Sequence, residues 1–360
     1  MADSTVSPQR LASLDALRGF DMFWIIGGGA LHGAVKTLGD SPFARLISGQ
    51  LQHVEWEGFH FYDLIFPMFV FIAGVSLAFS LPRSIERAGR AKTAWRLVRR
   101  AAVLFLLGVI YSGGLSKGLD QVRWLGVLQR IALASLGAGL FSIWLRGRSL
   151  ATICVTLAGG YWALLAWVPA PGGTPGDFRE DHNLVNWFDA HFLPGRKYNG
   201  DHDPEGILST IPAIANCLLG VLAGIFLRDS KLGESRKSTT LVGVGAVLVG
   251  VGVLWSGSFP LIKKLWTSSF VLVACGWSAI LLGTFHQIIG VWNCNRWATP
   301  FVWIGLNPIT IYLAANIADF SRLAQRFTGP VPGVMHALVA CGFGFLLAWW
   351  LHRNRIYIRV

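Results

Sequence analysis

The sequence predicts an all-α integral membrane protein, a polytopic bundle of about ten transmembrane helices with one long external loop as a cap. Of its 360 residues, 53% are hydrophobic and only 14% are charged, whereas soluble domains carry about 25% charged residues. Long apolar runs alternate with short charged connections. Because bundled membrane helices form one continuous body, we expect residues 1–360 to form a single transmembrane domain.

Ten segments approach the roughly 20 apolar residues that a bilayer-spanning helix needs. The predicted spans are residues 18–36, 61–81, 98–114, 125–145, 150–168, 207–227, 239–257, 266–291, 299–317 and 333–352. The first span is interrupted by Gly27, Gly28, Gly29 and His32.

The basic residues predict the orientation of the bundle. They concentrate in connections 82–100, 146–149 and 228–238 and at the C-terminus. With ten spans, these lie on one side with the N-terminus, and the positive-inside rule makes that side the cytoplasm. We therefore expect a multi-pass protein of the bacterial inner membrane with both termini cytoplasmic.

The net charge of +12 is spread over helix junctions, so we expect no nucleic-acid partner.

The connection at residues 169–206 is the longest external loop. It begins with a run rich in Pro and Gly, typical of a turn-rich exit from the membrane. The rest is too aromatic to be plain disorder, and we interpret it as a folded cap with a short interfacial helix near 183–192.

No metal site is expected. Four of the five cysteines, all except Cys294, fall within apolar spans, and no CxxC spacing occurs. The motifs HExxH and GxxxxGK[ST] are absent from the sequence, and GxSxG occurs only at Gly114–Gly118, between two predicted spans and not after a strand. This argues against a zinc protease, an α/β-hydrolase and an ATP-driven pump.

The first candidate site lies at the external end of the second span. Neutral His53 can accept a proton from a nucleophile or attack an activated acyl group itself. Asp63 can orient that imidazole, or cap the helix that follows, or do both. A histidine in such a loop is also commonly just an interfacial polar residue. Trp56, Glu57 and His60 lie between the two and are candidate substrate contacts.

Three further polar groups are candidates. Asp203-Pro204-Glu205 has the pattern of a helix start, and with Tyr198 and Asn199 it could instead bind a polar substrate.

Arg123, Gln129 and Arg130 lie at or inside a span, where an arginine is costly unless it is paired, snorkels or binds a phosphate. Asn307 belongs to a polar run in the ninth span, which predicts interhelical hydrogen bonds or a cavity wall.

In this order, the landmarks resemble the catalytic membrane domain of the heparan-alpha-glucosaminide N-acetyltransferase family, with its bacterial relatives. The matching segments are Ser13–Gly19, Gly27–Gly29, His53–Gly58, Asp63–Gly74, Gly126–Arg130, Tyr198–Asn199, Asp203–Gly206 and Gly305–Asn307. One departure is Ile25-Ile26, where the family carries a polar Asn-Tyr pair before the triple glycine.

The resemblance implies transfer of an acetyl group from cytoplasmic acetyl-CoA to an amino sugar or glycan across the membrane, by N- or O-acetylation. The family's active histidine falls on His53 and its following acid on Asp63, while His60 has no counterpart and remains a lining residue. We expect Arg130 and Arg123, with Gln129, to hold the CoA phosphates. The relatives also suggest a homodimer.

Two other classes of function stay open at this point. A proton-coupled transporter of a small polar solute would use the same ionisable groups as a relay, and it predicts internal repeats with paired broken helices; none is evident. A structural membrane subunit would need no active site, so that changing His53 and Asp63 would have no effect.

Overall fold

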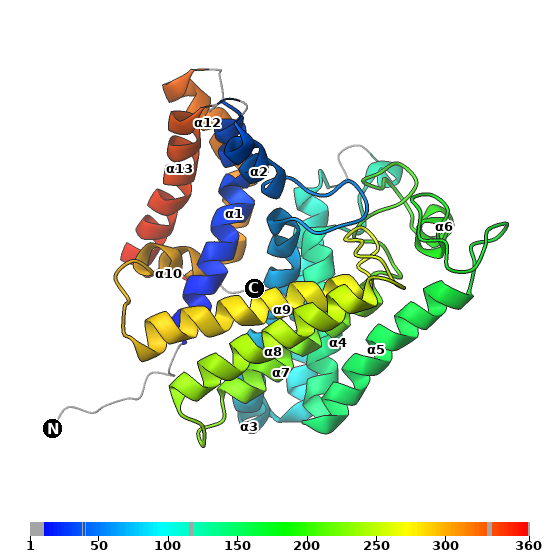
Figure 1. Ribbon diagram of the computed structural model, residues 1–360. Helices are drawn as coiled ribbons and strands as arrows, with labels where there is room; N and C mark the ends of the chain where they lie inside the picture. The colour runs from blue at the N-terminus through cyan, green and yellow to red at the C-terminus, as the bar shows by residue number, and fades with distance from the viewer. Residues whose placement is uncertain (1–10, 38, 40, 115–117, 330–332, 359–360) are drawn as a thin grey trace. The chain divides into compact units, whose positions relative to one another are not determined.

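The computed structural model describes residues 11–37, 39, 41–114, 118–329 and 333–358. Within these ranges the chain forms α-helices α1–α13, a short 3-10 helix (η1) and a π-helix (η2), with isolated β-bridges and no strand (Figure 1). The prediction of an all-helical polytopic protein is confirmed. The residues divide into two compact units, each described separately below.

The larger unit contains residues 41–232 and 243–280. Its elements are α2 (Pro42–Gln50), α3 (Phe61–Tyr111), η1 (Leu119–Gln121), α4 (Val127–Trp144), α5 (Arg148–Trp167), α6 (Leu184–Phe192), α7 (Thr210–Leu227), and most of α8 (Glu234–Trp255) and α9 (Ser268–Phe285). Helices α3, α4 and α7 pack against one another, and α5 packs on α7.

The smaller unit contains residues 1–40, 233–242 and 281–359. Its elements are α1 (Ala12–Lys36), the first turns of α8, the last turn of α9, η2 (His286–Val291), α10 (Thr299–Leu306), α11 (Pro308–Ile317), α12 (Phe320–Thr328) and α13 (Val334–Arg353). Helix α1 packs closely on α10 because Gly19 and Gly305 have no side chains; a Cβ at either would overlap backbone of the facing helix.

Among the residues that the structure describes, seven helices are long and apolar enough to cross a membrane: α3, α4, α5, α7, α8, α9 continued by η2, and α13. Helix α3 has 51 residues, and at about 1.5 Å per residue it is long enough for two crossings of a core about 30 Å thick. It contains the second predicted span, 61–81, and most of the third, 98–114, since the helix ends at Tyr111. Between them Gly89 has a φ of 77°, in the region that glycine tolerates best, and breaks the helix there.

The other two predicted spans differ from straight crossings. The ninth, 299–317, is two helices, α10 and α11, bent by 83° at Asn307; counted as one span, the pair raises the total to eight. The bend follows from Pro308, since the residue before a proline is pushed out of the helical region, and Asn307 has φ −133° and ψ 47°. The first predicted span lies in α1, which is not among the seven.

Small residues bring α3 and α7 into close contact. A Cβ at Gly74 would overlap the carbonyl oxygen of Cys217, and a Cβ at Gly220 would overlap that of Phe71. In addition, Asn216 donates from Nδ2 to the carbonyl oxygen of Pro67 at 3.1 Å. These contacts fix the first turns of α3, which carry Asp63.

The segment 169–206 is folded, as predicted, and contains the short helix α6. Val185 of α6 shares a buried apolar cluster with Tyr161, Leu165, Phe259, Ile262 and Leu265, and Trp56 packs against it. The Tyr161 hydroxyl donates to the Leu265 carbonyl oxygen at 2.7 Å. The cluster therefore ties the cap to the connection between α8 and α9, residues 256–267, which reaches the first candidate site.

Candidate functional site

His53 and Asp63 are in direct contact, as the sequence predicts. His53 Nδ1 lies 2.8 Å from Asp63 Oδ1. The two side chains differ sharply in exposure, 52% for His53 and 1% for Asp63. A carboxylate oxygen only accepts hydrogen bonds, so Nδ1 carries the proton when it bonds to Asp63. The lone pair of neutral His53 is then on Nε2, where it can accept a proton or attack an acyl carbon.

Asp63 both caps α3 and holds the histidine. Its Oδ2 accepts the backbone N–H groups of Val54 at 3.2 Å and His60 at 3.1 Å, and His60 is the N-cap residue of the helix. These bonds bring the 53–60 loop back onto the helix start. Asp63 therefore contacts the imidazole and caps α3 at the same time, so the two roles suggested by the sequence are compatible.

Lys263 also reaches this pair, which the sequence did not predict. Its Nζ lies 2.9 Å from Nδ1 and 3.4 Å from Nε2 of His53, and 3.3 Å from Asp63 Oδ1. Burial lowers the pKa of Lys263, while the charges of Asp63 and Glu205 oppose that shift. Lys263 lies in the 256–267 connection, 210 positions after His53, so no local pattern relates the two.

Aromatic and polar side chains surround the pair. The Tyr62 ring lies 4.8 Å from the His53 ring, centroid to centroid. Trp56 donates from Nε1 to the Phe178 carbonyl oxygen at 2.9 Å, which links the loop to the cap. Glu57 is exposed and forms a backbone bridge with Ile262. The His60 ring Nδ1 lies 3.1 Å from the Gln52 carbonyl oxygen and belongs to the loop scaffold.

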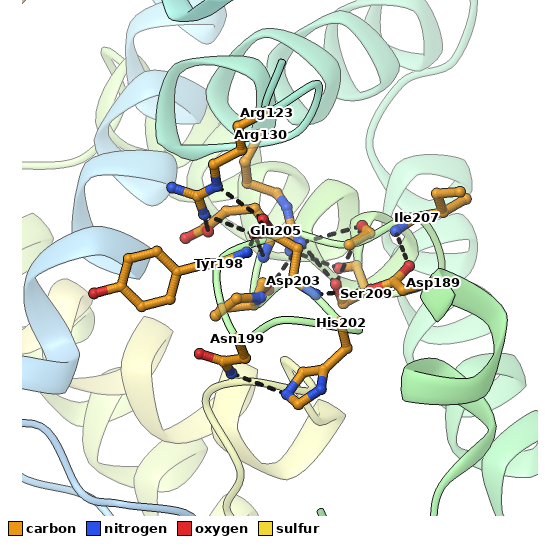
Figure 2. A network of polar contacts seen from close by, with 12 residues as sticks. Arg123, Arg130, Asp189, Tyr198, Asn199, His202, Asp203, Glu205, Ile207 and Ser209 are labelled. Atoms are coloured by element: carbon orange, nitrogen blue, oxygen red, sulfur yellow. Dashed lines mark hydrogen bonds and ion pairs between the residues drawn. The ribbon is translucent and has the colours of Figure 1, made fainter. Parts of the chain in front are cut away.

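A second network joins Arg123 to two acids (Figure 2). Arg123 donates from Nε and Nη2 to Asp203, at 2.8 and 2.7 Å, and from Nη2 to Glu205 at 2.6 Å. Burial opposes the charged form of Arg123, but the bonds to Asp203 and the charge of Glu205 outweigh it and raise the pKa of Arg123. Burial raises the pKa of Glu205, while the bond from Arg123 offsets burial and lowers the pKa of Asp203.

This network corrects the prediction that Asp203 caps the following helix. Helix α7 begins at Thr210 with Ser209 as its N-cap. Asp203 instead accepts the backbone N–H groups of Tyr198 and Glu205, at 3.0 and 3.1 Å, together with Arg123. A bidentate arginine is a stronger partner for a buried carboxylate than helix-end N–H groups.

Arg130 is buried and bonded mainly to backbone. Its Nη1 donates to the Ser209 carbonyl oxygen at 2.8 Å, and its Nη2 donates to Ser209 Oγ at 2.6 Å and to the carbonyl oxygens of Pro204 and Gly206 at 3.2 and 3.3 Å. The guanidinium also lies 5.1 Å from the centre of the Trp266 ring. Gln129 is buried against Gly108, where a Cβ would overlap its amide. These contacts favour a structural role for both; their predicted role in binding CoA stays a prediction.

The remaining candidates are Tyr198, Asn199 and Asn307, and each has its own set of contacts. Tyr198 is 70% exposed, and the Arg123 guanidinium lies 4.9 Å from the centre of its ring (Figure 2). The Asn199 side-chain amide lies 2.9 Å from His202 Nε2. Asn307 belongs to the smaller unit, where it donates to the Ile356 carbonyl oxygen and accepts the Ile358 N–H, both at 2.9 Å. Its side chain thus ties the α10–α11 bend to the C-terminal segment.

One group among the described residues has the ligand types of a metal site. Ligand atoms of Asp181, Asp201 and His202 all lie within 4.8 Å of one another. His202 Nδ1 is 2.8 Å from Asp201 Oδ1 and 3.3 Å from Asp181 Oδ1. Both carboxylates are exposed, which also fits an ordinary ion pair at the surface of the cap. The expectation of a metal-free protein stays a prediction.

The family model for the catalytic part of heparan-alpha-glucosaminide N-acetyltransferase matches residues 10–254. The chain belongs to this family. The resemblance read from the motifs is thereby confirmed. The matched segment includes both His53 and Asp63, as well as the whole Arg123 network. Lys263 and Asn307 lie beyond it.

Two curated relatives of the family show how far the similarity extends. The human heparan-alpha-glucosaminide N-acetyltransferase is 24% identical over 427 residues, covering 98% of this chain and 60% of the human protein. The mouse protein is 23% identical over 374 residues, covering 86% of this chain and 56% of the mouse protein. The chain thus spans somewhat more than half the length of the relatives it matches.

Proposed function

We propose that this family member is an integral-membrane acetyltransferase that moves an acetyl group from cytoplasmic acetyl-CoA to an amino sugar or glycan on the external side. The observation that carries the proposal is the His53–Asp63 contact, in which Nδ1 of the imidazole faces the carboxylate. Glycan is the acceptor class because the relatives bear the name of a glucosaminide N-acetyltransferase.

In the direct route, His53 is the general base. Its Nε2 takes the proton from the amine or hydroxyl of the acceptor while that group attacks the thioester carbon. The new C–N or C–O bond forms, the C–S bond breaks, and the proton passes to the departing CoA thiolate. Asp63 orients the ring and stabilises the imidazolium that forms.

In the two-step route, His53 carries the acetyl group. Nε2 attacks the thioester carbon, the C–S bond breaks, and CoA leaves as a thiolate that takes up a proton. The acceptor then attacks the acetyl-imidazole, the bond between Nε2 and the acyl carbon breaks, and the proton that the acceptor loses balances the one taken up by the CoA thiolate. A radiolabelled acetyl group trapped on the chain and lost in His53→Ala supports this route. A ternary-complex kinetic pattern supports direct transfer.

Both routes fit the predicted orientation, in which His53 faces outward while the donor arrives from the cytoplasm. The proposed acceptor contacts are Trp56, Glu57 and His60, which lie between His53 and Asp63 in the chain, with the exposed ring of Tyr198 and with Asn199 on the cap. The bilayer is the third partner, and a homodimer is the proposed assembly. We rest the binding of CoA on none of these three residues, because Arg123 and Arg130 already donate to groups within the chain and Gln129 is packed against Gly108.

The test is acetyl transfer from labelled acetyl-CoA to glucosamine by the full chain in lipid nanodiscs. His53→Ala should lose activity by about 10²–10⁴-fold, the range for removal of a general base. The matched control is His191→Ala, because His191 is an exposed histidine of α6 whose ring lies 2.8 Å from the Trp187 carbonyl oxygen. Wild-type activity that survives His53→Ala would contradict the proposal.

A transporter remains distinguishable by a simpler observation. An acetyltransferase should be stabilised against heat by CoA and should hydrolyse acetyl-CoA slowly when no acceptor is present. A proton-coupled transporter should show neither effect, and its thermal stability should respond to its solute instead.

A further inference from the structure

The Lys263 amine lies where the proposed reaction needs the amine of an acceptor. Its Nζ is 2.9 Å from His53 Nδ1 and 3.4 Å from His53 Nε2. Neutral imidazole carries a lone pair on one of its two ring nitrogens, so Nζ is close to that lone pair in either tautomer. A general base must lie within hydrogen-bond reach of the group that it deprotonates, or slightly farther when no substrate is bound. Lys263 already meets this condition.

The connection that carries Lys263 is fixed against the His53 loop. Before Lys263, the Gly58 N–H of that loop donates to the Leu261 carbonyl oxygen at 2.9 Å. After it, the Trp266 N–H donates back to the Lys263 carbonyl oxygen, also at 2.9 Å. Both bonds lie close to Lys263 in the chain, so its amine is held beside the imidazole by the backbone of the 256–267 connection.

The surroundings of Lys263 favour a reactive amine. Its side chain is only 21% exposed. Burial lowers the pKa of Lys263, while the charges of Asp63 and Glu205 oppose that shift. The unprotonated amine is the nucleophile, and a partly desolvated lysine gives up its proton more readily than a solvated one. Asp63 Oδ1, 3.3 Å from Nζ, can hold the amine in place through one of its N–H groups.

The adjacent lysine has a different environment. Lys264 donates from Nζ to Glu180 at 2.6 Å, and its Nζ lies 5.4 Å from the centre of the Trp56 ring. Its side chain is 29% exposed, so it is at least as open to reagents in solution as Lys263. Lys264 therefore reports the uncatalysed reaction of a lysine in the same connection.

We propose that Lys263 is an internal acetyl acceptor, which takes the acetyl group when acetyl-CoA is bound and no external amine occupies the site. The inference rests on the proposed acetyl transfer at His53 and adds a modification site to it. In the direct route, Nζ attacks the thioester carbon, the C–N bond forms and the C–S bond breaks. His53 takes the proton from Nζ and passes it to the departing CoA thiolate.

The two-step route leads to the same product. Nζ attacks the acyl carbon carried by His53, and the bond between the ring nitrogen and that carbon breaks. The proton that Nζ loses balances the one that the CoA thiolate took up. Acetyl-Lys263 is a neutral amide that fills the place of the acceptor amine, so acetyl-CoA alone should slowly inactivate the chain.

The experiment incubates the full chain in lipid nanodiscs with labelled acetyl-CoA and no acceptor. Mass spectrometry of the peptides then follows the acetyl group on Lys263 and Lys264. Because Lys263 is held beside His53, it should react at least about tenfold faster than Lys264. In His53→Ala, the rate at Lys263 should fall by about 10²-fold or more, while the rate at Lys264 stays the same. Rising glucosamine should protect Lys263 in the wild type, a readout that needs no variant.

Inactivation gives a second readout. Wild type incubated with acetyl-CoA before the assay should lose glucosamine acetylation over time. Lys263→Arg, whose guanidinium stays charged and is not acetylated in this way, should keep whatever activity it had before the incubation. Equal loss in both proteins would contradict the inference.

The outcomes separate this inference from the proposed function. If Lys263 and Lys264 react equally, or if neither His53→Ala nor glucosamine slows the reaction at Lys263, the inference is overturned. If glucosamine is acetylated while Lys263 stays unmodified without it, the inference is overturned and the proposed function stands. If neither glucosamine nor Lys263 receives an acetyl group, the proposed function fails and the inference fails with it.

Discussion

Asn216 of α7 donates a hydrogen bond from Nδ2 to the carbonyl oxygen of Pro67 in α3, at 3.1 Å. Pro67 lies one turn beyond Asp63, and as a proline it offers no N–H to the Asp63 carbonyl oxygen. The start of α3 is therefore held by side chains as well as by its own backbone: by Asn216 from the neighbouring helix and by Asp63 through the 53–60 loop.

Asn216→Leu should lower the stability of the protein by about 1 kcal/mol, the scale of an interhelical hydrogen bond in membranes. Thermal unfolding in detergent measures this as a small fall in the apparent melting temperature. No change would mean that the close α3–α7 packing fixes the helix start without this bond.

Gly220→Leu should be more damaging, because the new side chain would overlap the Phe71 carbonyl in the α3–α7 contact. We expect a loss of about 2–3 kcal/mol from overpacking. The matched control is Gly159→Leu on α5, where a Cβ meets nothing within 4 Å, so stability should change by less than about 0.5 kcal/mol. Equal effects at the two sites would contradict the packing described here.

Arg130→Met tests whether Arg130 supports the fold or binds the donor. The change removes the hydrogen bonds that Arg130 donates to the Ser209 carbonyl oxygen and hydroxyl and to the Pro204 and Gly206 carbonyl oxygens, which should cost about 3 kcal/mol. The apparent melting temperature should fall, while KM for acetyl-CoA of the remaining folded protein stays near wild type. Exposed Arg148 provides the control variant, Arg148→Met. A raised KM with unchanged stability would show instead that Arg130 contacts CoA.

The sequence predicts the His53 site well because its main relationships are local. Asp63 follows His53 by ten positions, and both the cap at His60 and the contact with the imidazole arise within one loop and one helix start. The apolar runs likewise predict where the helices lie. The Asn307-Pro308 pair carries a signal for the α10–α11 break, but the apolar composition around it favoured one straight span.

The contacts that were missed join distant parts of the chain. Arg123 and Asp203 are 80 positions apart and were interpreted separately, one as a phosphate ligand and the other as a helix cap. Lys263 lies 210 positions after His53, and no local motif relates the two. Pairing of charges across such separations depends on the packing of the cap and of residues 256–267, which hydropathy and local motifs do not encode.

The pH dependence of stability should report Asp189 of α6. Burial raises the pKa of Asp189 to about 6, against opposing bonds from the Ile207 and Asp203 N–H groups. The unfolded value is about 3.9, so the folded protein binds more protons between these values. Stability should fall by about 3 kcal/mol as pH rises from about 4 to 6, and then level off.

Asp189→Asn keeps the size of the side chain and an acceptor oxygen but removes this titration. Its apparent melting temperature should vary less between about pH 4 and 6 than that of the wild type. If both proteins show the same slope, the pH dependence comes from other groups and the Asp189 carboxyl is not the cause.

The central claim is that the chain transfers an acetyl group from cytoplasmic acetyl-CoA to an external acceptor and needs His53 to do so. Proteoliposomes of defined orientation, with labelled acetyl-CoA on the cytoplasmic side and glucosamine on the other, test it most directly. The account predicts acetylated glucosamine on the acceptor side, formed only when acetyl-CoA faces the cytoplasmic loops, and its loss in His53→Ala. Product formation that is independent of the side of acetyl-CoA, or that persists in His53→Ala, would contradict it.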